Sequence, residues 1–240
     1  MIDIHHKKFA MGAAAALAAG LLFGLPLHAQ ERSPVGPAPL PSTAAWPVAP
    51  GAKPAQGSAG YASDEAKRMV GWVISTGDNR GMPFVIVDKK QTKVFVFDAA
   101  GRLLGDTPVL LGLARGDDSA PGVGDKKLSD IRPDERTTPA GRFVASLGYG
   151  LGKQDILWVD YASALALHRV LPAGSRERRL QRIASVSPQD RRITFGCINV
   201  PTAFYDAVIH PAFIRTSGVV YILPEIKTIA EVFSGYPSLT

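Results

Sequence analysis

The sequence predicts a mainly β fold, a β-sandwich or barrel with a few short helices. Many short apolar runs rich in Val, Ile, Leu and Phe alternate with clusters of Gly, Pro and Asp, which is typical of short strands joined by turns. Helical patterns are few by comparison. A chain of 240 residues with 46% hydrophobic content has room for one well-packed domain, but not for two large ones.

Residues 1–29 are expected to be a secretory signal peptide. Lys7 and Lys8 precede an apolar stretch of mostly Ala, Leu and Gly, and the small residue Ala29 marks a cleavage point. An uncleaved membrane anchor is the alternative, although Gly and Pro interrupt the apolar stretch. Both interpretations predict a domain outside the cytoplasm, in the periplasm or cell envelope.

The segment after the signal is expected to be a spacer followed by a helix. Residues 30–62 are rich in Pro, Ala and Gly, which predicts a flexible linker. Residues 63–80 are expected to hold an N-terminal helix, because Ser63 suits the N-cap and Asp64 and Glu65 suit the first turn. This helix should end near residue 76 and pack on the domain.

The main domain is expected to span residues 81–224, with a C-terminal tail at 225–240. Apolar runs predict strands at 84–87, 93–97, 109–111, 142–147, 156–159, 165–168, 192–195 and 219–223. A helix is predicted at 201–210, with Pro201 at its first position and Pro211 ending it.

Charge and cysteine usage narrow the function classes. The formal charge of +6 and a pI near 9.5 favour an anionic environment such as a cell-wall polymer or membrane surface. The sequence has no recognition-helix pattern and no aromatic-basic motif, so nucleic acid is not expected as a partner. A single cysteine cannot form an internal disulfide, and the acidic loop at 117–134 lacks the spacing of a calcium loop. No cofactor or metal is expected.

The single cysteine, Cys197, is the candidate nucleophile. Residues 193–201 are interpreted as a strand, a tight turn and the start of a helix, so that unpaired helix N–H groups face the thiol. Such a position lowers a thiol pKa and favours the thiolate. Asn199 is expected to cap this helix, and Gly196 is expected to let a substrate carbonyl approach.

A thiol nucleophile needs a group that takes and returns a proton, and histidine suits this task. After the signal the chain holds two, His168 and His210. His168 ends an apolar strand and is preferred, because His210 lies one helix length from Cys197, roughly 14 Å. The alternative is that Cys197 is a buried small apolar residue and His168 a satisfied core or surface histidine.

Residues 83–224 resemble the catalytic domain of L,D-transpeptidases, also called the YkuD-type domain. Residues 84–97 resemble its opening pair of strands, residues 137–143 its Thr-Pro-x-Gly segment and residues 196–199 its cysteine signature, while His168 corresponds to its upstream histidine. Three departures stand out: Phe195 replaces a common histidine, Asn199 replaces a common arginine, and 29 residues separate His168 from Cys197, more than is usual.

The resemblance implies a cysteine acyltransferase that acts on peptidoglycan stem peptides through a Cys197 thioester. The acyl group would pass to another stem or to a wall-anchored acceptor protein. His168 would donate and accept the proton, with its ring oriented by a backbone carbonyl near His168 or Arg169. Residues expected to support the site or the oxyanion are Gly196, Arg169, Thr194 and Asn199. A hydrolase (carboxypeptidase) of the same fold and a non-catalytic wall-binding module are the alternatives.

The extra length between His168 and Cys197 falls in residues 171–190, which are rich in arginine. Guanidinium groups bind carboxylates through two hydrogen bonds, so this segment is expected to contact the carboxylates of peptidoglycan stems. The residues expected to do so are Arg176, Arg179 and Arg182. A solvated basic helix is the alternative.

Overall fold

The strands form one eight-stranded sheet and one separate pair in a computed structural model that describes residues 63–150, 153–170 and 177–237. The order in the large sheet is β3-β2-β1-β10-β5-β6-β7-β9. Its strands are β1 (Phe84–Asp88), β2 (Lys93–Phe97), β3 (Leu103–Pro108), β5 (Gly141–Tyr149), β6 (Asp155–Asp160), β7 (Leu165–Arg169), β9 (Ile198–Val200) and β10 (Gly218–Ile222). The short strands β4 (Leu111–Gly112) and β8 (Arg192–Thr194) pair in parallel.

Helices are short, as predicted, and the mainly β class is confirmed. They are α1 (Asp64–Thr76), α2 (Arg179–Ala184), α3 (Thr202–Phe204), α4 (His210–Phe213) and α5 (Ile229–Val232). A π-helical turn, Tyr205–Ile209, connects α3 to α4. Single 3-10 turns occur at Val123–Asp125, Leu128–Asp130, Pro133–Glu135 and Pro188–Arg191.

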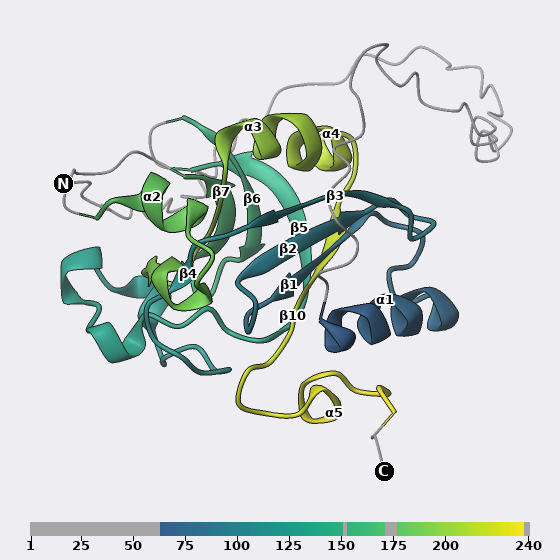
Figure 1. The fold of residues 1–240 in the computed structure, drawn as a ribbon, viewed down its shortest axis with the longest axis horizontal. Coiled ribbons are helices and arrows are strands. Elements are labelled where there is room, and N and C mark those ends of the chain that lie inside the picture. Colours follow the sequence, from purple (N-terminus) through teal and green to yellow (C-terminus); the bar gives the residue numbers. More distant parts are fainter. Residues whose placement is uncertain (1–62, 151–152, 171–176, 238–240) are drawn as a thin grey trace, which may run out of the picture. The chain divides into compact units, whose positions relative to one another are not determined.

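Strand β5 joins the two halves of the sheet. Its first half pairs with β10 and its second half pairs with β6 (Figure 1). Apolar side chains from both halves meet in one cluster, which includes Val85, Val96, Leu157, Leu167 and Ile198. The sheet therefore curls around a common core, which gives the expected sandwich or barrel character.

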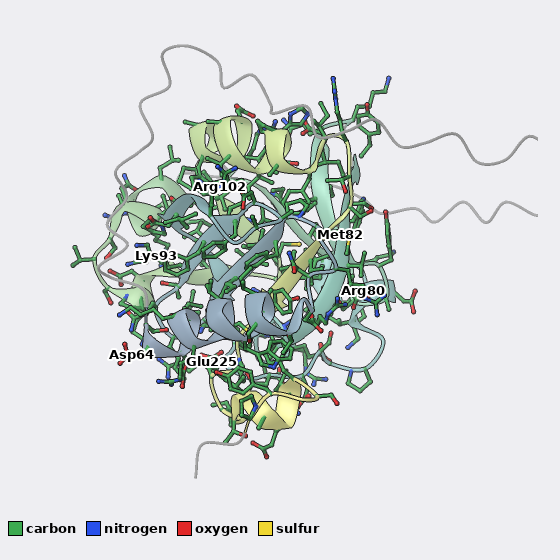
Figure 2. The ribbon with its side chains drawn as sticks, turned by 90° about the vertical axis from the view of Figure 1, so that its right-hand side faces the viewer. Asp64, Arg80, Met82, Lys93, Arg102 and Glu225 are labelled. Carbon is green, nitrogen blue, oxygen red and sulfur yellow. The ribbon has the colours of Figure 1, made fainter. Side chains whose placement is uncertain are left out.

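The half of the sheet with β1, β2 and β10 lies between two helical layers. One face packs against Tyr205, Ile209 and Phe213 of the α3–α4 helical segment. The other face packs against Met69 and Val73 of α1. Figure 2 looks onto α1, with Asp64 labelled at its start, as the helix crosses the strands. Burial on both faces explains why these strands are apolar at successive positions.

The helix expected after Ser63 is present as α1. The Ser63 hydroxyl accepts a hydrogen bond from the Ala66 N–H at 3.1 Å, and Gly77 ends the helix at a φ of 66°. Residues 225–237, expected to be a tail, include α5 and place Phe233 and Tyr236 in the same apolar cluster as α1. The predicted signal peptide and linker lie outside the described residues. No helix in the described ranges is long and apolar enough to cross a membrane.

Two strand predictions are corrected. The strand expected at 109–111 is reduced to an isolated bridge at Leu110 and to Leu111 in β4, and strand β3 at Leu103–Pro108 was not predicted. Gly105, Asp106 and Pro108 obscured β3, which tolerates them because it is an edge strand and Pro108 is its last residue. Residues 198–200, expected to lead into a helix, form strand β9.

The helix predicted at 201–210 begins later and does not stop at Pro211. Pro201 is the N-cap rather than the first helical residue, and α4 continues through Pro211 to Phe213. Proline inside a helix removes one N–H and crowds the preceding turn. The π-helical turn just before it changes the local hydrogen-bond spacing, which accommodates Pro211 without ending the helix.

Candidate functional site

Strand alternation assigns the candidate site to the face of β6, β7 and β9 that turns away from the core. Leu157, Leu167 and Ile198 point into the core cluster, so the alternating residues point the other way. His168 pairs with Asn199 across the parallel strands β7 and β9. Cys197 directly precedes β9 and comes two residues before Asn199, so strand alternation places it on the same face as His168.

Cys197 is half-buried beside a small pocket. Its Sγ lies 3.6 Å from the carbonyl oxygen of Ala164, to which the thiol donates. The pocket is lined by Ser119, Val123, Thr137, Pro139, Ser163, Ala164, Leu165, Phe195, Gly196 and Cys197. The sulfur therefore borders the pocket and is held by a hydrogen bond to a backbone carbonyl.

The expected helix N-terminus is not at Cys197. Strand β9 follows the cysteine directly, and the helix begins only at Thr202. Burial raises the pKa of the Cys197 thiol, and the Ala166 backbone N–H, the charge of Arg179 and the cysteine's own N–H offset this only in part. The resting sulfur is therefore a protonated thiol at neutral pH rather than the predicted thiolate.

Both ring nitrogens of His168 have partners. Nδ1 lies 2.9 Å from the backbone oxygen of Arg169, and Nε2 lies 3.0 Å from Nδ2 of Asn199. A carbonyl can only accept, so Nδ1 carries the proton and Nε2 accepts from the amide. The carbonyl contact expected from the sequence is present. His210 lies instead on the α3–α4 segment, 4.0 Å from Asp155.

His168 is a neutral imidazole in this setting. Burial lowers its pKa, the hydrogen bond to Arg169 raises it, and the positive charge of Arg179 lowers it further, with a net downward shift. A neutral imidazole has one nitrogen lone pair with which to accept a proton. On His168 that lone pair is on Nε2, which faces Asn199.

Asn199 is a fully buried strand residue and not a helix cap. Its backbone exchanges two hydrogen bonds of 2.9 Å with Leu110. Its side chain donates to His168 and accepts at 3.0 Å from Arg179. The capping role failed because Asn199 pairs within β9, where flanking Ile198 and Val200 face the core.

The turn before Cys197 is held by two threonine hydroxyls. Thr194 Oγ1 accepts from the Gly196 N–H at 3.2 Å and donates to the Cys197 carbonyl at 2.7 Å. The Thr138 hydroxyl donates to the Gly196 carbonyl at 2.7 Å. The Gly196 N–H, expected to hold an oxyanion, is thus engaged by Thr194.

Gly196 is required at its position. Its φ of 133° is reached almost only by glycine, and a Cβ there would lie 2.9 Å from the Thr137 carbonyl oxygen. The Thr-Pro segment and the cysteine segment are therefore in direct contact.

A buried ion pair, Lys89 with Asp117, holds the backbone carbonyl of Thr138. The ammonium of Lys89, fully buried, donates to the Thr138 carbonyl at 3.0 Å and to Asp117 at 2.7 Å. Asp117 also accepts from the backbone N–H groups of Glu225, Ile226 and Lys227. Asp117, in the acidic loop at 117–134, is therefore buried. Sequence reasoning missed Lys89, although a lysine two residues after the apolar run 84–87 was a signal, and it quoted Thr138 within the Thr-Pro-x-Gly segment without giving it a role.

The predicted arginines have separate roles. Arg169 turns its guanidinium away from the site, to Asp155 and Asp206, so that only its carbonyl contacts His168. Arg182 donates to carbonyls of its own segment, those of Glu177 and Asp190. Arg179 contacts Asn199, and Arg176 lies outside the described residues.

Phe195 has an unexpected partner. The guanidinium of Arg136 lies over its ring, 4.0 Å from the centroid, in a cation–π contact. Phe195 also lines the pocket beside Cys197. Phe195, which replaces the histidine common in the L,D-transpeptidase family, thus holds the Arg136 guanidinium near the pocket. Across the described ranges, no group of three His, Cys, Asp or Glu side chains is placed to hold a metal.

Comparison with known proteins gives little beyond this geometry. No protein-family model and no curated protein matches the chain. Among solved structures, the chain is similar to the L,D-transpeptidase (residues 123–326) from Xylanimonas cellulosilytica DSM 15894, with a TM-score of 0.35 and 14% identity. The match covers 59% of this chain, which spans 60% of the length of that structure. A likeness at this level leaves the function to be inferred from the site itself.

Proposed function

We propose that the chain is an exported cysteine acyltransferase of the L,D-transpeptidase type that acts on peptidoglycan stem peptides. The observation that carries the proposal is the placement of the sole cysteine, half-buried beside a pocket and on the same sheet face as a neutral histidine. The contact between the Thr-Pro segment and Gly196 supports it, because those are the two motifs on which the resemblance rests.

Catalysis would begin from a neutral thiol and a neutral imidazole. Cys197 Sγ would attack the carbonyl at the L-centre of diaminopimelate as its proton passes to His168 Nε2. That proton would then go to the leaving amine of the terminal D-alanine, which leaves a thioester on Cys197. An amine of a second stem or of a wall-anchored protein would take the acyl group and restore the thiol.

Two features support activation during catalysis rather than at rest. The thiol pKa is raised and the His168 pKa is lowered, so the resting pair exchanges no proton. The backbone N–H groups of Ala166 and Cys197 favour negative charge on sulfur. A substrate that excludes water from the pocket would strengthen these interactions.

Replacing His168 by glutamine is expected to slow acylation of Cys197 by about 10²–10⁴-fold, because the proton acceptor is lost. The rate should be measured by mass spectrometry of the adduct at neutral pH. His210→Gln is the matched control and should leave the rate unchanged, since His210 lies near Asp155 on the α3–α4 segment. Equal rates for the His168 variant and the native protein would remove His168 from the mechanism.

The transfer reaction is tested by incubating the full chain with purified sacculi and analysing the muramidase digest. Stem-to-stem cross-linked dimers that appear only with intact Cys197 are the expected result. Trimmed monomers without dimers would identify a hydrolase instead. Retention on sacculi with no change in the digest would indicate a wall-binding module and overturn the proposal.

A further inference from the structure

Two hydrogen bonds connect an arginine of α2 to the candidate base, and a third holds the base from its other side. Arg179 donates through Nη1 to Oδ1 of Asn199 at 3.0 Å, and Nδ2 of Asn199 donates to Nε2 of His168 at 3.0 Å. The last bond runs from His168 Nδ1 to the Arg169 carbonyl at 2.9 Å. Because guanidinium can only donate and the carbonyl can only accept, the direction of every bond is fixed.

This arrangement covers the lone pair that catalysis needs. The Asn199 amide is fully buried, so rotating it would break two hydrogen bonds and leave polar groups unpaired. While Arg179 holds Oδ1, the N–H of the amide must face Nε2. His168 is then oriented but not free to accept a proton from Cys197.

Arg179 is also the member of this hydrogen-bonded chain to which an anion from solvent can bind. Its Nε donates to Oε2 of Glu177 at 2.5 Å. The Glu177 side chain is 37% exposed and the Arg179 side chain 12% exposed, so the pair lies at the surface end of the chain. A carboxylate from solvent can replace Glu177 with the paired hydrogen bonds that guanidinium favours.

We propose that Arg179 is a specificity-determining positioning residue that keeps His168 covered until a substrate carboxylate draws its guanidinium away from Asn199. The inference rests on the proposed function, in which the donor is a carboxylate-bearing stem peptide. Release of Oδ1 lets the amide turn and exposes Nε2. Nε2 then takes the thiol proton as the bond from Sγ to the substrate carbonyl carbon forms, and passes it to the leaving amine.

The charges around His168 agree with this order of events. From α2 it faces the cation of Arg179, with Glu177 beyond it; from β9 it shares a face with the protonated thiol of Cys197. On its own strand, the guanidinium of Arg169 is held on the other side by Asp155 and Asp206. Moving Arg179 away removes a positive charge that lowers the pKa of both His168 and the Cys197 thiol, so His168 becomes a stronger base while the thiol stays protonated until that base takes its proton.

The test compares Arg179→Met with Arg178→Met in the full chain. Arg178 is adjacent and carries the same charge, but its side chain contacts Gln181 and not Asn199. The first measurement is alkylation of Cys197 by iodoacetamide, which has no carboxylate. The Arg179 variant should react roughly five- to tenfold faster than the native protein, because one hydrogen bond covering the base is weakened. The Arg178 variant should match the native protein.

The second measurement is acylation by a donor stem peptide whose side-chain carboxylates are free or amidated. The native protein should prefer the free form at least tenfold, and Arg179→Met should accept both equally. A general loss of packing would slow both donors and leave their ratio unchanged, so the ratio isolates the positioning role.

Equal alkylation rates in all three proteins, or an unchanged donor ratio in the Arg179 variant, would overturn the inference. If no protein is acylated by either donor while alkylation rises as expected in the Arg179 variant, the proposed function fails and the hydrogen-bonded chain to His168 stands. Thermal unfolding of each variant verifies that the fold is retained.

Discussion

Cys197→Ala is expected to abolish covalent modification of the protein by a carbapenem, while the native protein gains the mass of one adduct. The chain has a single cysteine, so no second thiol can react. Carbapenem opening by Cys197 would form the same kind of thioester as the proposed reaction. Intact-mass spectrometry after incubation at neutral pH measures the result directly.

The folded state should survive this substitution. Cys197 is half-buried, and its thiol donates one weak hydrogen bond, to the Ala164 carbonyl at 3.6 Å. The thermal unfolding midpoint of the variant should therefore lie close to that of the native protein. A native protein that stays unmodified, or a variant modified to the same extent, would contradict the assignment of the nucleophile.

Asp117→Ala is expected to reduce the free energy of unfolding by about 3–5 kcal/mol. The side chains of Lys89 and Asp117 are 0% and 1% exposed, so the substitution leaves a buried ammonium without its closest carboxylate. It also removes the acceptor for three backbone N–H groups of residues 225–227. Urea unfolding at pH 7 measures the loss. Activity should fall as well, since Lys89 holds the Thr138 carbonyl.

The loss should depend on pH in a defined direction. Burial alone would raise the pKa of Asp117, but hydrogen bonds from Lys89 and the backbone of Lys227, Glu225 and Ile226 lower it to about 2. A carboxyl whose pKa is lowered on folding stabilises the fold above its ordinary pKa of 3.8. About 2 kcal/mol of this stabilisation should disappear as the pH falls from about 4 to 2.

Asp118→Ala is the matched control for this prediction. Asp118 pairs with Lys227 at 2.6 Å, but the two side chains are 75% and 41% exposed. An exposed ion pair contributes about 0–1 kcal/mol, so this variant should unfold close to the native protein. Equal losses for the two variants would show that the buried ion pair has no special role in stability.

The sequence predicted best where burial is uniform along a strand. Strands β1 and β2 are apolar over successive residues because helices cover both of their faces, and β2 was predicted with its observed bounds. Strand β3 was missed because Gly105, Asp106 and Pro108 interrupt its apolar pattern. Strand β9 has only three residues and borders Pro201, which favoured the helical interpretation.

The main residues of the candidate site were predicted from the sequence, but the hydrogen bonds between them were not. Cys197 and His168 share a face, as strand parity requires, yet parity became visible only once the pairing of His168 with Asn199 was known. The Asn199 contacts depend on Arg179, 20 residues away in the chain. No local pattern reports such a contact, since it joins α2 to β9 through side chains far apart in the sequence.

The long spacing between His168 and Cys197 has a simple origin in the parallel pairing of β7 and β9. Two parallel neighbours cannot be joined by a tight hairpin; the chain must travel back to its starting edge before the second strand begins. The connection between β7 and β9 can change in length without shifting Cys197 relative to His168, because the hydrogen bonds between the two strands set their register. Changes in chain length between residues 171 and 190 can therefore accumulate while Cys197 and His168 keep their register.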